Sequence, residues 1–461
     1  MRWNPKDLPE ERPSTFDETG KRLKIYPATV KGRYRTRRTI SYFILILIFL
    51  VLPWTKFQGK QTILLDIIER KFILFGSTYW AHDGPLVFFP LILAALTIVL
   101  VTNIWGRFWC GWGCPQTVFI DFFYRRIEQW IEGNHIKRQK LDRSPWNLNK
   151  ITKKTVKWIL FIIISAHIAH SFTAYFVGAE KLVWITLAPP TEHWPLFIFV
   201  QSLTIVLLFD FAWFREQFCL IMCPYGRFQS VLMDKTSMAI VYDEPRGEPR
   251  RGSGAKELGD CINCYRCVQV CPTGIDIRKG LQMECIACTA CIDVCNDVMS
   301  NLKRPPNLIK YATATGKEKK FKEILTKKNS IYFGLILVVL ISFATILFNR
   351  KALNIEIIRA IESPYTVSGE TVINHFKASI TNQSQELMTI TKLSTDNGNI
   401  IAPEIPLTVA SGQHKKIHFF IKLPKKLFAN SGKLSGTIKI NFSTINQSVS
   451  DTKTVTYIGP K

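Results

Sequence analysis

The chain has 461 residues, a formal net charge of +25 and 47% hydrophobic residues. This length is typical of roughly two to four structural units. Its twelve cysteines all lie between Cys110 and Cys295, which argues against a secreted disulfide scaffold and favours metal-binding thiols in a reducing compartment. Such a basic chain suits nucleic acid or an anionic membrane as partner. Its apolar segments favour the membrane, and no nucleic-acid partner is expected.

Five apolar segments predict helices that cross a membrane, near residues 40–54, 85–105, 158–177, 194–214 and 331–348. Each is close to the roughly 17–25 residues that a helix needs to span the hydrocarbon core. The first is the shortest, and we interpret it as an uncleaved anchor because no small-x-small cleavage site follows it. Buried core helices are the alternative for the other four, but their aromatic ends and near lack of charge argue against it.

The distribution of Lys and Arg predicts how these helices are oriented. The N-terminal segment and the four connections hold, in order, 11, 4, 11, 1 and 19 of these residues. Basic connections tend to stay in the cytoplasm. The N-terminal tail 1–39 and the segment 215–330 are therefore expected in the cytoplasm, with the chain after the fifth helix outside. All twelve cysteines then lie on the reducing side.

The rest of the chain divides into three kinds of segment. Residues 57–80 carry apolar side chains at helical spacing and predict an amphipathic helix on the membrane surface. Residues 243–260 are rich in Gly, Pro and charge and predict a linker. Short alternating runs in 349–461 predict a β-sandwich of roughly 110 residues. His375 and His414 in this last part are interpreted as surface residues.

Eight cysteines form two runs of Cys-x2-Cys-x2-Cys-x3-Cys, a spacing typical of iron–sulfur proteins. In two-cluster ferredoxins the fourth cysteine of each run binds the other cluster. We therefore assign one [4Fe-4S] cluster to Cys261, Cys264, Cys267 and Cys295, and the other to Cys285, Cys288, Cys291 and Cys271. Zinc is the main alternative, but zinc ribbons use two pairs of cysteines. Cys295 departs from the pattern because Asn296, not proline, follows it.

A second motif, Cys-x3-Cys-Pro, occurs twice, at Cys110/Cys114 and at Cys219/Cys223, each time just after an apolar segment. Positions i and i+4 share one face of a helix, so each pair is expected to present two thiols together. Because both pairs follow equivalent membrane helices, they could converge on one four-thiol site. Soft thiolates favour Cu(I), and the same set could hold an iron–sulfur or another redox centre.

Two histidines, His167 and His170, lie three residues apart inside the third apolar segment. Intramembrane histidines are costly and often functional, so both are candidate copper or haem ligands. A hydrogen bond between helices is the alternative. Asp210 is expected to reach water at the end of its helix. The sequence holds no Cys-x-x-Cys-His motif for covalent haem, no phosphate-binding loop and no flavin fingerprint.

Three longer stretches carry a family resemblance. They read TNIWGRFWCGWGCPQTVFIDFFYRRIEQWIEG at 102–133, REQFCLIMCPYGRFQSVLMD at 215–234 and CPTGIDIRKGLQ at 271–282. Together they resemble the cytochrome c oxidase accessory proteins called CcoG, FixG or RdxA, over nearly the whole chain. The resemblance implies a multi-pass protein of the bacterial inner membrane with a periplasmic, immunoglobulin-like C-terminal domain.

The same resemblance implies a cupric reductase that converts Cu(II) to Cu(I) for assembly of cbb-type cytochrome c oxidase. It implies that the reaction and the copper belong to the paired thiols of Cys110, Cys114, Cys219 and Cys223. Oxidase assembly factors, copper chaperones and a cytosolic electron donor would be the partners, with a homo-oligomer possible. A quinol-linked electron-transfer subunit and a redox-sensing assembly scaffold without copper reduction are the alternatives.

Together these features predict a mixed fold. The expected order is the tail 1–39, a membrane domain 40–242, a ferredoxin-like two-cluster domain with its linker at 243–330, a fifth helix at 331–348 and an immunoglobulin-like β-sandwich at 349–461.

Overall fold

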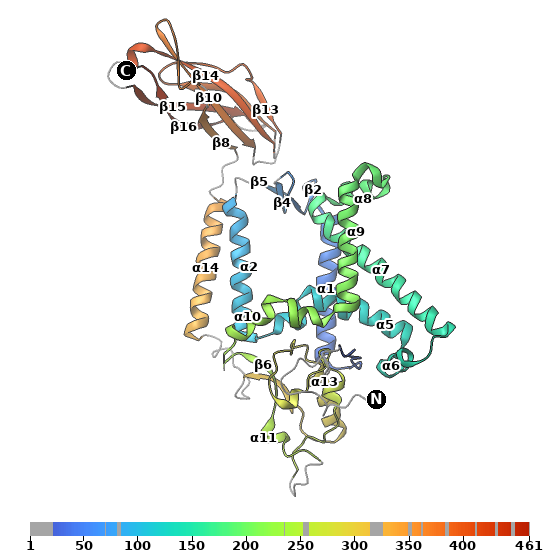
Figure 1. Cartoon of the computed structure of the whole chain (residues 1–461). Helices are drawn as coiled ribbons and strands as arrows, with labels where there is room; N and C mark the ends of the chain where they lie inside the picture. Colours follow the sequence, from blue (N-terminus) through green and yellow to red (C-terminus); the bar gives the residue numbers. More distant parts are fainter. Residues whose placement is uncertain are drawn as a thin grey trace. The chain divides into compact units, whose positions relative to one another are not determined.

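The computed structural model describes residues 22–460 except 70, 81–83, 235, 252–257, 314–325, 349–352, 361–362, 383–386, 411–412, 429–431 and 444–447. The chain forms two compact units. One comprises Met1–Thr55 and Val87–Ser342, and the other comprises Lys56–Leu86 and Phe343–Lys461 (Figure 1). Parts of the predicted tail 1–39 and of the predicted linker 243–260 lie outside the described residues.

Within the described residues, five helices are long and apolar enough to cross a membrane: Arg33–Trp54, Phe88–Trp105, Leu148–Val177, Pro190–Phe214 and Lys327–Leu347. Their main helical elements are α1 (Arg33–Val51), α2 (Gly84–Trp105), α7 (Leu148–Val177), α9 (Trp194–Leu208) and α14 (Lys327–Phe348). The five predicted apolar segments fall on these helices, and the predicted multi-pass helical fold is confirmed.

The first helix begins earlier than its apolar segment because its basic first turns have partners inside the protein. Arg38 is buried and donates from Nη2 to Asp121 over 3.0 Å, and Arg35 also pairs with Asp121. Although burial alone would raise it, the guanidinium groups of Arg38, Arg35 and Arg125 hold the pKa of Asp121 well below its usual value. Buried charges persist when they are paired in this way.

Short helices connect the spans of the first unit: η2 (Leu52–Trp54), α3 (Phe108–Trp112), α4 (Pro115–Phe119), the π-helix η4 (Ile120–Tyr124), α5 (Arg125–Glu132), α6 (His135–Arg143), α8 (Ala179–Leu187), η5 (Pro190–His193), the π-helices η6 (Phe209–Phe214) and η7 (Phe218–Met222), and α10 (Pro224–Leu232). The apolar core of this part includes Tyr124, Phe161 and Ile168, which are all buried.

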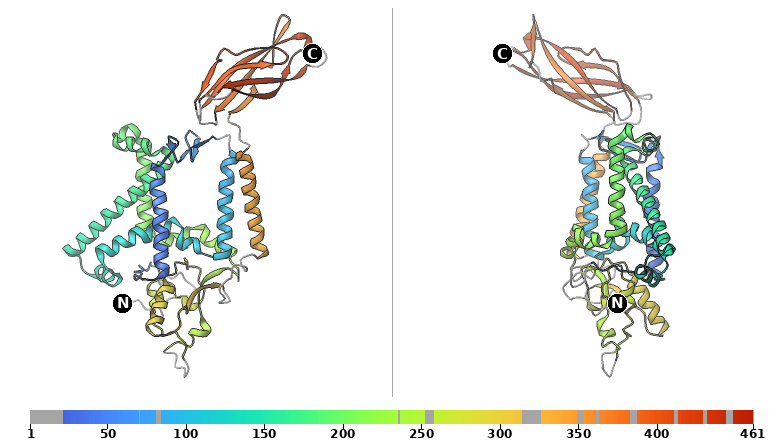
Figure 2. Two further views of the ribbon diagram at one scale, coloured as in Figure 1. Left: turned by 180° about the vertical axis from the view of Figure 1, so that it is seen from behind. Right: turned by 45° about the vertical axis from the view of Figure 1, so that its right-hand side comes forward.

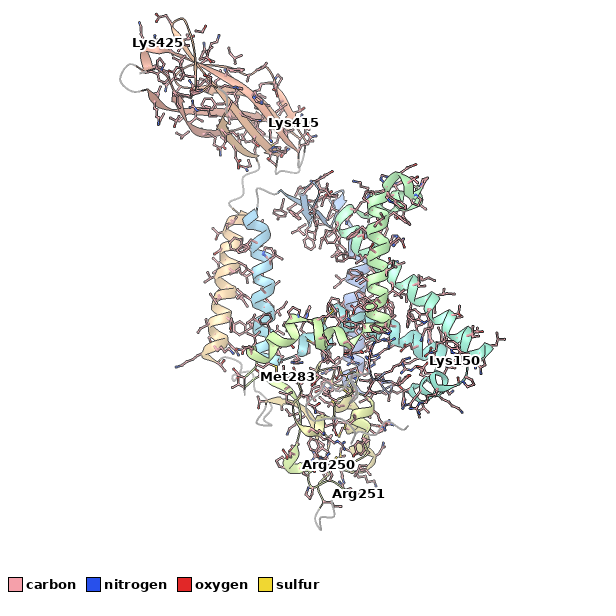
Figure 3. The ribbon with its side chains drawn as sticks, viewed as in Figure 1. Lys150, Arg250, Arg251, Met283, Lys415 and Lys425 are labelled. Atoms are coloured by element: carbon pink, nitrogen blue, oxygen red, sulfur yellow. The ribbon has the colours of Figure 1, made fainter. Side chains whose placement is uncertain are left out.

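The ferredoxin-like part is closed by two antiparallel strands, β6 (Met238–Tyr242) and β7 (Ile309–Thr313). Between them lie α11 (Glu244–Gly247), α12 (Arg266–Gln269), η8 (Ile277–Lys279) and α13 (Ala290–Asn301). Asp293 on α13 caps α1, since its carboxylate accepts from the backbone N–H groups of Tyr34 (3.1 Å) and Arg35 (2.7 Å). In Figure 3, Arg250 and Arg251 lie at the end of the ferredoxin-like part that is far from the long apolar helices, whereas Met283 lies at the end near those helices.

The amphipathic helix predicted for 57–80 is wrong. This stretch forms five short strands: β1 (Lys56–Phe57), β2 (Lys60–Gln61), β3 (Ile63–Asp66), β4 (Lys71–Leu74) and β5 (Ser77–Trp80). The last three make an antiparallel sheet in chain order. Gly59, between β1 and β2, and Gly76, between β4 and β5, have positive φ, a conformation that favours glycine.

The C-terminal part is a two-sheet sandwich, as predicted (Figure 2). Its strands are β8 (Leu353–Arg359), β9 (Thr366–Ser368), β10 (Thr371–Asn382), β11 (Met388–Thr395), β12 (Asn399–Ile401), β13 (Leu407–Val409), β14 (His414–Pro424), β15 (Lys433–Ser443) and β16 (Ser448–Ile458), with a short helix η10 (Lys425–Phe428). One sheet has the order β12-β14-β10-β8, with β9 beside β10, and the other β13-β11-β15-β16.

The sandwich core consists of inward residues from both sheets, among them Phe419, Ile438 and Tyr457, which are fully buried. His375 lies on the outer face of β10, where its Nε2 is 3.0 Å from Nδ1 of His418 on β14. His414 lies beside Thr381 at the end of the same strand pair.

Candidate functional site

The two cysteine runs fold into loops with the same backbone pattern. In the first run Asn263 and Tyr265 have positive φ, two and four residues after Cys261. In the second run Ala287 and Thr289 have positive φ at the same two offsets from Cys285. Non-glycine residues rarely adopt this conformation, and when they do, they cluster at functional sites. The repeated strain shapes each loop so that its cysteines point to one side.

The first predicted set of thiols surrounds one cavity. Cys261, Cys264, Cys267 and Cys295 all line it, so the fourth cysteine of the second run lies with the first three of the first run. Burial raises the pKa of the Cys267 thiol, and burial with the neighbouring Cys264 and Cys261 raises that of Cys295 to about 12. Cys264 is exposed, whereas Cys261 and Cys267 are buried.

The second predicted set is buried more deeply. Burial, together with the neighbouring Cys271 and Cys288, raises the pKa of Cys285 to about 12. The pKa of Cys291 is raised well above its usual value by burial and by Cys288, Cys285 and Cys271. The backbone N–H of Ala287 donates to Cys285 and partly offsets this rise. These four thiols therefore share one small region, as the crossed assignment requires.

The chemistry of both sets fits a cubane cluster. Each supplies four thiols from closely spaced loops, and cysteine thiolates are the usual ligands of [4Fe-4S] clusters. When bound, two such clusters would supply one-electron transfer. The exact ligand assignment stays a prediction.

The Cys-x3-Cys-Pro pairs do not each lie on one helix face, contrary to expectation. Cys110 lies in α3, whereas Cys114 caps α4. Cys219 lies in the π-helix η7, whereas Cys223 caps α10. In both copies the second cysteine donates its N–H to the carbonyl five residues earlier, at 2.9 Å in the first and 2.8 Å in the second. Proline then opens the next helix, where its missing N–H costs nothing.

A further feature repeats in the two copies. The residue four positions before the first cysteine has positive φ, Gly106 in the first copy and Arg215 in the second. This turn ends the membrane helix and redirects the chain toward the cysteines. Arg215 is held there by Glu128, whose carboxylate accepts from its guanidinium at 2.6 and 3.2 Å. The sequence motif showed the repeat, but not this turn.

The four paired thiols lie near one another. Burial raises the pKa of Cys219, and Cys114, Cys110 and Cys223 raise it further. Burial likewise raises the pKa of Cys110 to about 11, with contributions from Cys114 and Cys223. The two pairs are therefore neighbours, but among the described residues they do not form the single four-thiol site that the sequence predicted.

Two glutamines connect the copies reciprocally. Gln229, fully buried on α10 of the second copy, donates from Nε2 to the sulfur of Cys110 over 3.3 Å. Gln116, on α4 of the first copy, donates to Asp210 (2.9 Å) and to the carbonyl of Arg215 (3.1 Å). Asp210 is therefore tied to the first motif, whereas the sequence suggested only contact with water. No pattern in the sequence marks these glutamines.

The first motif touches the second cluster loop directly. Cys110 packs in one apolar cluster with Ile286 and Cys288. A Cβ atom at Gly111 would lie 2.6 Å from the carbonyl oxygen of Ile286 and 2.7 Å from that of Ala287. Only glycine therefore allows this approach.

Arg107 and α1 brace the same contact. Arg107 donates to the carbonyls of Met283 and Cys285 in the loop and, over 3.1 Å, to Gly226 on α10. On the other side, Tyr42 donates to the carbonyl of Gly111 over 2.6 Å, and buried Arg38 donates to the carbonyl of Cys288. The paired thiols, the cluster loop and α1 thus form one packed assembly.

The two candidate histidines have different surroundings. His167 is exposed on the surface of α7. His170 is partly buried, with Nδ1 2.8 Å from the carbonyl of Ala166 on its own helix, and it lines a cavity. Among the described residues, no three His, Cys, Asp or Glu side chains form a ready site for a single metal ion.

Three family models match the chain. A model described as a 4Fe-4S dicluster domain matches residues 214–314, and one described as a 4Fe-4S binding domain matches 87–135. A third, described as an IG-like fold at the C-terminal of FixG, matches 343–460. The first covers both cysteine runs and Cys219/Cys223, and the second covers Cys110/Cys114.

Curated relatives decide the family. Protein RdxB of Cereibacter sphaeroides is 34% identical over 387 residues, which cover 79% of this chain and 80% of RdxB. The chain belongs to the FixG family. Nitrogen fixation protein FixG of Rhizobium meliloti is 37% identical, and protein RdxA of Cereibacter sphaeroides is 38% identical. These two alignments cover 64% and 63% of this chain but only 58% of FixG and 62% of RdxA, less than two thirds of either relative.

Membership of the FixG family confirms the predicted resemblance and makes this chain an iron–sulfur electron-transfer protein with membrane helices. Its fold and family fit a protein of the bacterial inner membrane. Among solved structures, a FixG-related protein from Vibrio parahaemolyticus aligns with 24% of this chain and 98% of its own, at 18% identity and a TM-score of 0.20.

Proposed function

We propose that this FixG-family protein reduces Cu(II) to Cu(I) at the thiols of Cys110, Cys114, Cys219 and Cys223, for assembly of a cbb-type cytochrome c oxidase. The packing of Cys110 against Ile286 and Cys288 carries this proposal. It joins a thiol-rich site to a loop whose cysteines suit an electron-carrying cluster, with no intervening layer of protein.

The positions of the two cysteine sets suggest different roles in electron transfer. The exposed Cys264 gives the first cysteine set an edge that a soluble electron donor can approach. The second set is buried beside the paired thiols. Cu(II) would take up one electron there and leave as Cu(I), which thiolates bind in preference to harder ions. Gln229, bonded to the Cys110 sulfur, is placed to orient that thiol.

The copper site would form as the ion binds. The paired thiols are near one another but do not yet converge on a single ion position within the described residues. Because each pair is interrupted by a helix end, small rotations of the cysteine side chains would bring them together. Copper chaperones and oxidase assembly factors are the expected partners of the product.

We also propose that the N-terminus and the ferredoxin-like part face the cytoplasm and that the β-sandwich faces the periplasm. The alternating 11, 4, 11, 1 and 19 basic residues support this orientation. It keeps all the cysteines in the reducing compartment, where thiols persist.

Steady-state reduction by the purified protein tests the function. With a reduced ferredoxin as electron source, we expect Cu(II) reduction that falls when any one of the four paired cysteines becomes alanine. Oxidation of a quinol with no response to copper would favour the quinol-linked role instead. If the protein shows neither Cu(II) reduction nor quinol oxidation, the result would favour an assembly scaffold.

A second function is favoured by a specific observation. The 4Fe-4S binding model covers Cys110 and Cys114, so the four paired thiols could hold a third iron–sulfur cluster in place of copper. Two clusters would give about eight irons per chain and three about twelve. Iron analysis of the anaerobically purified protein separates the two.

A further inference from the structure

A second cavity lies among the outer parts of α7, α8 and α9, away from every cysteine of the site above. It has a volume of about 150 Å³. Apolar side chains, among them Leu182, Phe197 and Val200, form most of its wall, and His170, His193 and Gln201 bring polar groups to it.

His170 is held in one tautomer. Its Nδ1 lies 2.8 Å from the carbonyl of Ala166, a group that can only accept, so Nδ1 carries the proton. Nε2 then has its lone pair free for a ligand. His170 therefore brings an acceptor nitrogen to the wall of this cavity.

Gln201 adds a polar side chain inside the apolar span Pro190–Phe214. Among the described residues, the side chains of Gln201 and His193 make no hydrogen bond to another residue, and both side chains are exposed. A polar group at membrane depth without a partner is costly. A ligand that both donates and accepts hydrogen bonds would satisfy all three side chains.

Size and composition narrow the ligand class. A cavity of about 150 Å³ lined by apolar side chains is large enough for one benzene-sized ring. It is too small for a haem, and the described residues offer no third metal-binding side chain beside the two histidines. Trp184 on α8 and Trp194 on α9 belong to helices that form this cavity, and both side chains are exposed.

We propose that this cavity binds the head group of a lipid quinone or quinol. The ring would contact the apolar wall, its oxygens would bond to Gln201 and to Nε2 of His170, and its isoprenoid tail would remain in the bilayer. The proposal goes beyond copper reduction and shares no residue with the paired thiols, so either can fail without the other.

Binding of decylubiquinone to the full-length protein in quinone-free nanodiscs tests this assignment, with empty nanodiscs as the partition control. We expect saturable binding near one per chain. His170→Leu and Gln201→Leu should each weaken it by at least about tenfold, the scale of one hydrogen bond to a buried group. His167→Leu, on the same helix but outside the cavity, is the matched control and should bind as the native chain does.

Val200→Phe provides a second variant, because it fills the cavity without touching the polar groups. Unchanged iron content identifies variants that remain folded. Loss of binding in Val200→Phe, with binding retained in His167→Leu, would support the proposal. Absence of saturable binding by the native protein, equal losses in His167→Leu and His170→Leu, or Cu(I) binding that depends on His170 and His193 in place of quinone binding would overturn it.

Discussion

The contact at Gly111 gives the sharpest prediction, because the same motif holds a matched control. In Cys110-Gly111-Trp112-Gly113-Cys114 the two glycines face different neighbours. A Cβ at Gly111 would meet the backbone carbonyls of Ile286 and Ala287, whereas a Cβ at Gly113 would meet only the Trp109 ring, at 2.7 Å. Trp109 is 37% exposed and can turn aside, but the loop backbone cannot.

The magnitude follows from these distances. Ordinary contact begins at 3.4 Å, so a methyl group at Gly111 forces the 2.6 Å carbonyl to retreat by about 0.8 Å. Overpacking of this kind costs about 1–3 kcal/mol. If that cost falls on the packing of the loop at Ile286 and Ala287 against Gly111, the equilibrium between the packed and the separated loop shifts by about 5- to 150-fold.

Single-turnover kinetics measures the effect. Anaerobic protein is reduced with dithionite, freed of excess reductant and mixed with Cu(II), and reoxidation is followed by visible absorbance. We expect Gly111→Ala to slow reoxidation by at least about fivefold with iron content unchanged. Gly113→Ala should stay close to the native rate.

Equal rates in Gly111→Ala and the native protein would show that the contact between motif and loop has no part in copper reduction. Equal slowing in both glycine variants would also count against a role for this contact, since a general distortion of the motif would explain the result.

Four further predictions follow from other contacts. Glu128→Gln leaves the buried Arg138 and the partly buried Arg215 without the carboxylate that both contact, and should destabilise the protein by about 3–5 kcal/mol in thermal unfolding. Burial alone would raise the pKa of Glu128, but the two arginines lower it from 4.5 to about 2. The stabilisation that Glu128 provides should therefore be complete above pH 4.5 and decline as the pH falls toward 2. Arg38→Gln removes a positive charge bonded to the second cluster loop and should lower one reduction potential by on the order of 50 mV in an EPR-monitored titration. Cys264→Ser should remove roughly half of the iron. A membrane-impermeant thiol reagent should label a cysteine introduced at Lys433 in intact cells but not one at Lys140, and the opposite pattern would reverse the orientation.

Hydropathy located the five spans because a long apolar run has few other stable environments. It missed the true start of α1, because Arg35 and Arg38 look unfavourable until Asp121 is placed beside them. Pairing between residues more than eighty positions apart leaves no trace in a local window.

Residues 57–80 were misread for a related reason. Ile63, Leu64, Ile67 and Ile68 match a helical period by chance, while strands of two to four residues are too short to show alternation. The glycines of the turns were the available signal, since positive φ at Gly59 and Gly76 separates the strands.

For the site, spacing alone predicted which cysteines share a cavity, since Cys295 does lie with Cys261, Cys264 and Cys267. It also suggested that the two Cys-x3-Cys-Pro pairs lie near each other, and a common four-thiol site stays a prediction. The contact of Gly111 with the cluster loop, and the bond from Gln229 to Cys110, depend on tertiary packing and had no counterpart in the motifs.

Copper binding by the paired thiols, separate from the iron–sulfur clusters, is tested most directly by the iron and copper content of anaerobically purified native protein and of Cys219→Ala after one equivalent of Cu(I). We expect about eight irons per chain in both proteins, with copper retained by the native protein and lost from the variant. A native iron content near twelve that drops by about four in Cys219→Ala, with no bound copper in either protein, would show instead that these thiols hold a third cluster.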